Sequence, residues 1–314
     1  MKPFCLIACL FVCGLSKSQK TETYYDFSWK KCDPLLARFY SIVEKTDSGW
    51  LRKDYYIGGM KMQMQALFAD SACNVYNGTT YFFYANGQLS EMGRRLNNKQ
   101  EGVCLSFHYN GAMSDSATYH DGKQVGSRLK WHANGFPSDS IYYKNDSIKI
   151  AVGWFDDGSP SEAGYLKNDQ SDGKWNFYHK NGKIAASEIY SQGKLVSAEY
   201  HNEDGIAESS TPKEEQPATF KGGLDGWRRH LEKNLYWPDG YHFKDGNMAV
   251  VGVTFTVNEE GKIEDSYVST PFHPEFDKIA LRTILQSPKW KSATQDNRRV
   301  KYRMTQAITF TEPE

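Results

Sequence analysis

The 314-residue sequence lacks an excess of charge of either sign and is short of aliphatic residues. Its 38 basic residues balance 38 acidic ones, so no long-range field would recruit nucleic acid or an anionic membrane. Hydrophobic residues amount to 39%, yet 8 Trp, 20 Tyr and 17 Phe make the chain rich in rings. This composition does not support one large aliphatic core, and the length predicts about two domains.

Long hydrophobic runs are also missing, apart from one near the start. Phe4 to Leu15 is an apolar run of about 12 residues, well short of the ~20 that span a bilayer. Lys2 precedes the run and the small residues Ser16 and Ser18 follow it, which is typical of a secretory signal peptide. We therefore predict that residues 1–18 are cleaved and that the protein is exported. A retained anchor is the alternative.

Cysteines are few, and half of the six lie within this leader. One of them, Cys9, follows lipobox-like letters at Leu6-Ile7-Ala8, but fewer apolar residues precede it than lipoprotein cleavage needs. The mature chain would keep Cys32, Cys73 and Cys104. Export allows one disulfide among them, and burial as small side chains is the alternative. Their spacing fits no zinc site.

Six Asx-Gly pairs recur along the middle of the chain at intervals of 23 or 24 residues. Because Asx-Gly supplies two positive-φ positions, each pair predicts a type I′ hairpin turn. A second turn follows about 11 residues later, so each period is two short strands. An aromatic residue stands four positions before five of the glycines, which predicts a hairpin meander whose core is a stripe of rings. An exposed ligand or glycan platform is the alternative. The pairs are Asn86-Gly87, Asn110-Gly111, Asn134-Gly135, Asp157-Gly158, Asn181-Gly182 and Asp204-Gly205.

The units from Glu101 to Gly111 and from Gly173 to Gly182 carry the pattern most clearly. They resemble MORN repeats, in the variant form found in bacterial antitoxin-like proteins. The resemblance covers residues 78–205. Residues 19–77 read as a lead-in with one degenerate unit. An antitoxin-like role would conflict with export.

Histidines form a column within the repeats. His108, His132 and His179 stand three residues before their turn glycines, and His201 stands four before. A metal ladder would need these rings stacked on one face, but Tyr84 and Phe155 occupy equivalent places. We expect a solvated strand face and no metal, and no cofactor is indicated elsewhere.

The repeat spacing ends near Gly205, and a polar linker is predicted at residues 206–216. Residues 217–311 have a different pattern, which predicts a small antiparallel sheet with two helices on one face. The fold class is therefore mainly β, an elongated antiparallel meander followed by an α+β domain. The expected elements are a helix at 225–234, strands at 248–257 and 263–269, a helix from Pro274, and a strand at 300–310.

Short motifs in residues 217–311 resemble the TonB C-terminal domain. The resemblance implies the family fold, location in the periplasm or at the outer-membrane periphery of a Gram-negative bacterium, and docking onto outer-membrane transporters by strand pairing. A long Pro-rich arm and an inner-membrane helix are missing from the sequence, so the resemblance does not carry energy transduction. The motifs are Pro217-x-x-Phe220-x-Gly222-Gly223, Tyr236-Trp237-Pro238, Val253-x-Phe255-x-Val257, Phe276-Asp277-x-x-Ala280 and Pro288-Lys289-Trp290.

The last strand is the candidate partner-binding element. At a sheet edge, its free backbone groups would accept a partner strand. Lys301 and Arg303 would face outward, either to steer an acidic peptide or to protect the edge from aggregation. Trp237 and Trp290 read as core rings. The candidate partner-binding residues are Arg299, Val300, Lys301, Tyr302, Arg303 and Met304.

Motifs of known catalytic chemistry are absent: GxSxG, HExxH, a P-loop and a dinucleotide fingerprint do not occur. Carboxylate pairs such as Asp156-Asp157 and Glu259-Glu260 fall in predicted turns and are expected to be solvated. We therefore predict a non-enzymatic envelope adaptor that binds a transporter or another envelope protein, and no nucleic acid. The alternative is a structural protein whose repeats bind glycan, lipid or protein. Membrane association and oligomeric state stay open.

Overall fold

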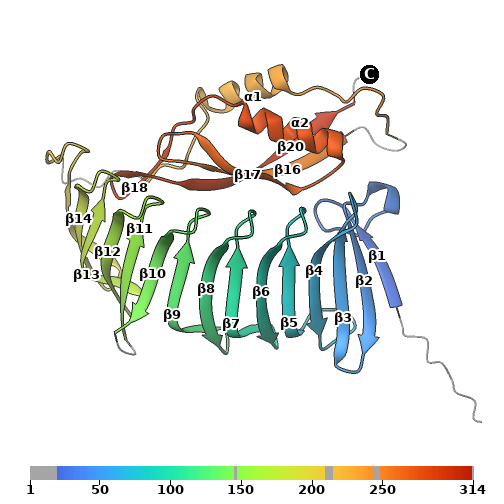
Figure 1. Ribbon diagram of the computed structural model, residues 1–314, viewed down its shortest axis with the longest axis horizontal. Coiled ribbons are helices and arrows are strands. Elements are labelled where there is room, and N and C mark those ends of the chain that lie inside the picture. The colour runs from blue at the N-terminus through green and yellow to red at the C-terminus, as the bar shows by residue number, and fades with distance from the viewer. Residues whose placement is uncertain (1–19, 145–146, 209–214, 244–247, 313–314) are drawn as a thin grey trace, which may run out of the picture.

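The computed structural model describes residues 20–144, 147–208, 215–243 and 248–312 (Figure 1). The predicted signal peptide, the Cys9 lipid site, the turn at Asn145-Asp146 and most of the linker lie outside these residues. The described part is mainly β and has two helices, as the sequence predicts.

Strands β1 to β15 form one antiparallel sheet in which each strand pairs with the next along the chain. The sheet begins in the predicted lead-in, where β1–β4 pair in the same order. The turns between these first strands lack the Asx-Gly pairs of the later repeats. The strands are β1 Lys20–Tyr25, β2 Phe39–Thr46, β3 Gly49–Tyr56, β4 Lys61–Phe68, β5 Tyr76–Phe83, β6 Leu89–Leu96, β7 Lys99–Phe107, β8 Met113–His120, β9 Lys123–Trp131, β10 Pro137–Tyr143, β11 Ile148–Trp154, β12 Pro160–Lys167, β13 Gln170–Tyr178, β14 Ile184–Ser191 and β15 Lys194–Tyr200, with a 3₁₀ turn η1 at Pro34–Leu36.

The two rows of turns have different geometries, and this corrects the prediction for the Asx-Gly pairs. In the Asx-Gly row the glycine has positive φ (Gly87, 90°), but its Asn86 does not, and the loop closes with Tyr84 N–H donating to Gln88 O. This is a three-residue loop, which leaves the asparagine side chain free to bond elsewhere. The opposite row has the two consecutive positive-φ residues of a type I′ turn, as at Asn97 (49°) and Asn98 (68°).

Side chains in the Asx-Gly row connect each turn to the backbone of the next. His132 Nε2 bonds to Trp154 O at 2.9 Å, and Asn134 Nδ2 donates to Asp156 O at 2.7 Å. The expectation that the histidine column is a solvated face is therefore wrong, because these rings are built into the turn row. The same bonds recur from His108 to Trp131 O, His179 to His201 O, Asn86 to Tyr109 O, Asn110 to Ala133 O and Asn181 to Glu203 O.

The interior of the repeat sheet is thin. The aromatic stripe four residues before the turn glycines, from Phe83 to Tyr178, is half-buried. Buried rings such as Trp175 and Phe177 belong to the opposite face. Gly164 makes room for Trp175, since a Cβ on that glycine would lie 2.1 Å from the indole. The repeats thus rely on small local clusters, in accord with the weak aliphatic composition.

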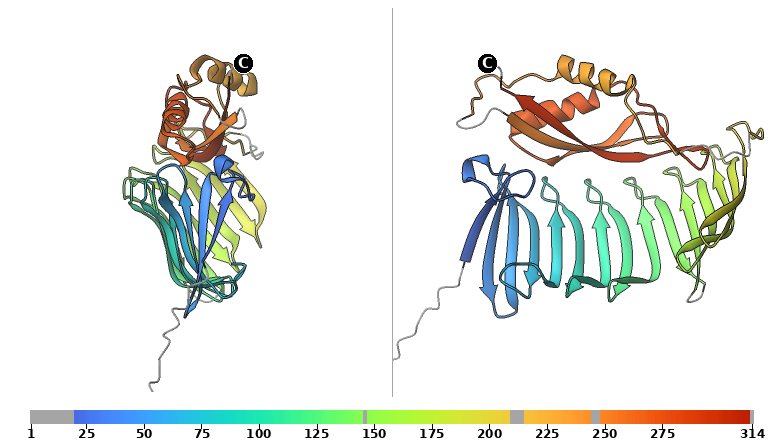
Figure 2. Two further views of the ribbon diagram at one scale, coloured as in Figure 1. Left: turned by 90° about the vertical axis from the view of Figure 1, so that its right-hand side faces the viewer. Right: turned by 180° about the vertical axis from the view of Figure 1, so that it is seen from behind.

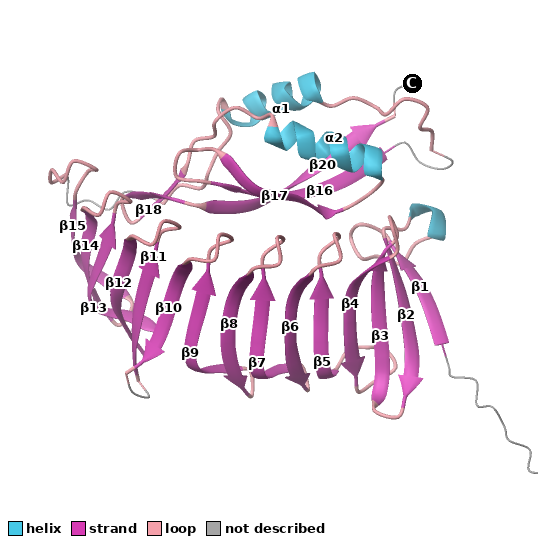
Figure 3. Cartoon of the chain, viewed as in Figure 1, coloured by secondary structure: helices cyan, strands magenta, loops and turns pink. Residues whose placement is uncertain are grey.

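The C-terminal elements lie along the Asx-Gly row of turns, with their helices on the side away from it (Figures 1 and 2). The main sheet has the order β17-β16-β20, and the two-stranded β18–β19 hairpin extends from it. Figure 3 shows the contrast between the helix-containing part and the all-strand repeats. The elements are α1 Gly223–Asn234, β16 Met248–Val257, β17 Ile263–Thr270, α2 Pro274–Leu285, β18 Ala293–Gln295, β19 Arg298–Val300 and β20 Tyr302–Thr311.

A close-packed core joins the two helices to one face of this sheet. Alternate β16 residues Val251, Val253 and Phe255 are fully buried, together with Phe276 of α2 and Ile308 of β20. The alternation comes from the two-residue period of a strand. Trp290 is in this core and Trp237 packs against it, as the sequence predicts.

Candidate partner-binding edge and its contacts with the repeats

The candidate edge is β20, which pairs with β16 from Val257↔Tyr302 to Met248↔Thr311. β20 is the outer strand of the sheet order, so its other side carries unpaired backbone groups. Its side chains alternate between Ile308 and Phe310 toward the helices and exposed Thr305, Ala307 and Thr309 toward the helix-free face. The edge is thus neutral and accessible over most of its length.

The six candidate residues fall on two strands. Arg299 and Val300 are in β19, which pairs with β18, and Lys301 separates β19 from β20. Tyr302, Arg303 and Met304 begin β20. The single predicted strand at 300–310 is therefore interrupted, and its first residues belong to a hairpin that contacts the repeats.

Basic side chains of this hairpin bind carboxylates in the last rungs of the repeats. Arg298, 6% exposed at its side chain, donates to Glu162 Oε2 at 2.5 Å and to Ser161 O. Arg299 Nε donates to Glu203 Oε1 at 3.1 Å. These pairs join residues more than 90 positions apart, which no local pattern in the sequence could reveal.

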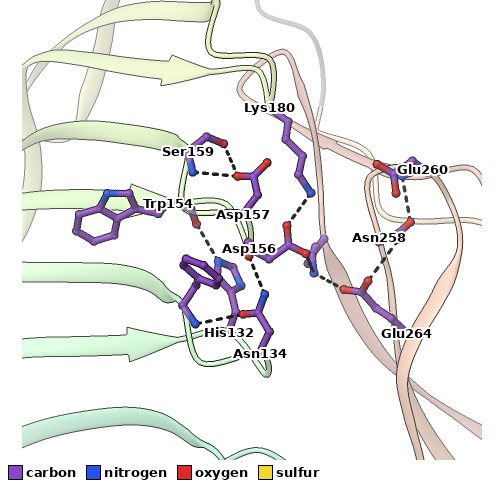
Figure 4. Close-up of polar contacts among 12 residues, drawn as sticks. His132, Asn134, Trp154, Asp156, Asp157, Ser159, Lys180, Asn258, Glu260 and Glu264 are labelled. Carbon is purple, nitrogen blue, oxygen red and sulfur yellow. Dashed lines mark hydrogen bonds and ion pairs between the residues drawn. The ribbon is translucent and has the colours of Figure 1, made fainter.

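Lys301 lies between two carboxylates, so the expectation that it faces outward is wrong. Its ammonium donates to Asp156 Oδ2 at 2.8 Å and also to Glu264 of β17. Asp156 additionally accepts from Lys180 at 2.6 Å, and Figure 4 shows Lys180, Asp156 and Glu264 converging between the turn row and the C-terminal sheet. Arg303 is exposed, and it donates to Tyr267 Oη at 2.6 Å.

Burial and ion pairing act in opposite directions on these groups. Burial would raise the pKa of Asp156, but hydrogen bonds from Lys180 and Lys301 outweigh it and lower that pKa to about 2. Burial likewise disfavours charged Lys301, but Asp156 and Glu264 hold the pKa of Lys301 above its usual value. Asp156 is therefore a charged member of an ion network, rather than the solvated turn carboxylate that the sequence suggests.

Aromatic rings form the contact at the middle of the turn row. The Tyr267 ring of β17 stacks on Tyr109 with centroids 4.2 Å apart and meets Tyr84 edge-on at 5.3 Å. At the start of the row, Arg38 lies 3.9 Å from the centroid of Phe272. The C-terminal sheet is thus held at three separate places along the repeats.

The β18–β19 hairpin tip inserts at the end of the row. Asn297 Nδ2 donates to His201 O at 2.9 Å and to Ala185 O at 3.3 Å. Its neighbour Asp296 faces the buried carboxylate of Glu188, and burial together with the Glu188 charge raises the pKa of Asp296 to about 7. Both tip residues have positive φ, at 48° and 60°, which Asp and Asn tolerate better than most residues.

Hollows at this interface are modest and polar. One of about 220 Å³ lies around the hairpin tip and is lined by His179, Glu203, Asn297 and Arg299 among others. Within the described residues no cluster of three or more His, Cys, Asp or Glu could hold a metal. Cys32, Cys73 and Cys104 are free and half-buried. The site thus suits recognition between polypeptides better than enclosure of a small molecule.

One family model matches a segment of the chain. Residues 244–311 match the family model of the Gram-negative bacterial TonB protein C-terminal domain. The match includes β16, β17, α2 and β20, but not residues 217–243, which also carried the sequence resemblance. This family is a non-enzymatic interaction domain of the cell envelope.

No curated protein matches the chain. The resemblance of residues 78–205 to MORN repeats has no family match behind it and remains an interpretation of the sequence. No helix in the described residues is both long and apolar enough to cross a bilayer.

Sequence reasoning missed the repeat residues that hold the C-terminal domain. They stand two positions before the turn glycines, as Tyr109, Asp156, Lys180 and Glu203 do. A signal was present, because this position is uncharged in the first three rungs (Ala85, Tyr109, Ala133) and charged in the last three. The change from uncharged to charged residues does not by itself indicate a contact, because the sequence does not show that a second domain lies along the row of turns.

Proposed function

We propose that this protein is a non-enzymatic adaptor of the cell envelope whose TonB-like domain captures an extended segment of a transporter or another envelope protein on β20. The observation that supports this most directly is the unpaired edge of β20 in a domain that matches the TonB C-terminal family. Strand addition would supply main-chain hydrogen bonds along Tyr302–Thr311. Export and a periplasmic location belong to this proposal.

The contacts with the repeats divide the candidate residues into those that are free to bind a partner and those that the repeats already bind. Tyr302, Arg303 and Met304 lie on the open edge, whereas Arg299 and Lys301 are engaged by the repeats. We therefore place the partner strand against Tyr302–Thr311. The repeats would act as the rigid arm that presents this edge. In domain terms, we propose a repeat arm through Gly205, a linker at 206–216 and a binding domain at 217–311.

The test is titration of the full chain with a TonB-box-like peptide, followed by amide hydrogen exchange. Slower exchange confined to residues 302–311 would support strand addition. Replacing a β20 residue whose N–H points away from β16 by Pro should weaken the effect, because Pro removes one backbone donor. Peptide binding without any protection of β20, or protection elsewhere, would count against the proposal.

A second candidate function is favoured by one observation. Large apolar side chains of the repeats are well exposed, including Val103 at 58%, Tyr142 at 56% and Val196 at 65%. Such residues could contact glycan, lipid or protein. If partner capture in envelope extracts survives Pro substitution on β20 but is lost when these residues become Ser, the repeats are the binding surface.

A further inference from the structure

The segment that leads into the β20 edge is strongly basic in sequence but largely neutralised in the fold. Arg298, Arg299 and Lys301 each bind a repeat carboxylate, namely Glu162, Glu203 and Asp156. Arg303 is the exception: its guanidinium contacts Tyr267, and among the described residues it has no carboxylate within ion-pair distance. The open edge therefore presents one free cation instead of four.

We propose that the repeat arm determines the class of partner that β20 accepts. By masking the basic segment, Asp156, Glu162 and Glu203 make the edge select an uncharged extended segment over an acidic one. This inference rests on the strand-addition function proposed above and specifies the partner of that same site. In a chain without these three carboxylates, Arg298 and Arg299 would lose their carboxylate partners while Lys301 kept Glu264, and the edge would attract acidic segments instead.

The repeats carry these acids where their own pattern changes. Asp156 and Glu203 stand two positions before turn glycines, at a place that is uncharged in the first three rungs. In the rung of Asp156, Phe155 replaces the histidine and Asp157 the asparagine of the turn ladder. Phe155 is buried, with the Arg298 guanidinium 5.9 Å from its ring centroid. The departures from the repeat thus coincide with the residues that receive the basic segment.

The rest of the edge fits a neutral partner. Thr305, Ala307, Thr309 and Thr311 are exposed in alternation along the free strand, and none carries charge. Just beyond the C-terminal end of β20, the Glu312 carboxylate lies within hydrogen-bond distance of His242 Nδ1, at 3.0 Å. A partner strand of about ten residues would therefore meet mostly small or β-branched neutral neighbours, which favour β-branched side chains across the pair.

The experiment compares two synthetic ten-residue peptides on the full chain, one of alternating Thr and Val and one with three of its Thr replaced by Glu. Dissociation constants are measured at low and at high salt for the wild type and for the variant D156N/E162Q/E203Q. The control E101Q/D121N/D169N removes three carboxylates that also pair with basic side chains, His120, Lys99 and Lys149, but in the opposite row of turns.

We expect the wild type and the control to bind the Thr/Val peptide more tightly than the acidic one, because replacing Thr by Glu removes β-branched side chains that suit the neutral edge. The D156N/E162Q/E203Q variant should favour the acidic peptide by roughly tenfold at low salt, and high salt should erase this preference because it screens surface charges. A wild type that already prefers the acidic peptide tenfold would overturn the inference. So would a variant whose preference equals that of the control.

A second measurement does not depend on strand addition. Heparin resin reports exposed clusters of positive charge, so the D156N/E162Q/E203Q variant should elute at higher salt than the control, which has the same net charge. If neither peptide binds any form, the strand-addition proposal fails. Equal elution of the variant and the control would then separately show that the basic segment was not masked.

Discussion

The two cores of this molecule are built in opposite ways. In the C-terminal domain, Val253, Phe255 and Phe276 are completely buried in one continuous cluster. In the repeats, the described clusters are small, such as Met64, Ala66 and Phe68, and the turn ladder of His and Asn side chains joins one rung to the next. A sheet one layer thick cannot enclose many side chains, so polar bonds between neighbouring turns take over part of the stabilising role.

The largest expected effect is in the continuous core. Phe276→Ala should destabilise the C-terminal domain by about 3 to 5 kcal/mol, because it removes a fully buried ring that contacts Trp237, Phe272 and Phe310. Urea unfolding followed by tryptophan fluorescence measures the loss. Leu285→Ala, on the same helix but 55% exposed, is the matched control and should cost little. A comparable loss for both would contradict the contrast between the cores.

In the repeats the close contact of Gly164 with Trp175 is the most sensitive point. Gly164→Ala should cost about 1 to 3 kcal/mol, because its new methyl group would meet the indole at 2.1 Å. In a Trp175→Ala background the same substitution should cost far less, since the clashing ring is gone. The cycle is measured by thermal unfolding. If the two substitutions have additive effects, the cost of Gly164→Ala does not come from a clash with Trp175.

Asp296 at the hairpin tip should make the stability of the folded protein depend on pH. The pKa of Asp296 is raised to about 7, so folding favours its protonated form. The protonated Asp296 side chain therefore contributes its full stability below about pH 4, the pKa of the unfolded chain. This contribution is lost as the pH rises through the folded-state pKa of about 7. Asp296→Asn should therefore stabilise the protein by about 1 to 2 kcal/mol at pH 8 and change little at pH 4, in urea titrations at each pH.

Asp265→Asn provides the control for this effect, because Asp265 also has positive φ but is exposed. An equal gain from both substitutions at pH 8 would assign the effect to backbone preference. The Asp296 effect would then have nothing to do with the buried charge near Glu188.

The smallest effect concerns one bond of the turn ladder. His132→Ala removes the contact of Nε2 with Trp154 O and should cost about 1 kcal/mol. His120→Ala removes an exposed imidazole from the opposite row and should cost less. Local hydrogen exchange at residues 154–158 should rise in the first variant alone. No change there would mean that the ladder is incidental to rung packing.

Most secondary structure was readable from the sequence. The strand pair β16–β17 followed from alternation at Val251, Val253 and Phe255, and α2 followed from Pro274 and its apolar stripe, because these signals are local. The Asx-Gly pairs located the turns correctly but indicated the wrong turn type. The choice between loop types depends on where the asparagine side chain finds its partner, and that partner is the carbonyl of another rung.

Only part of the candidate site could be predicted from the sequence. The sequence singled out the last strand as one that would bind a partner if it lay at a sheet edge, and β20 does lie at an edge. The contacts of Arg298, Arg299 and Lys301 with the repeats were not predicted. Those contacts join the chain over 96 to 145 positions. No periodicity spans such separations. The same basic cluster would look free in any reading of the sequence.

The sequence by itself determined the period of the repeats, the order of the C-terminal elements and the neutrality of the chain as a whole, since each depends on residue types and short spacings. The tertiary structure decided where the charges meet. Ion pairs such as Lys301–Asp156 require two distant segments to be brought within 2.8 Å, and folding alone sets that distance. It thereby turned a basic strand into a mostly neutral edge.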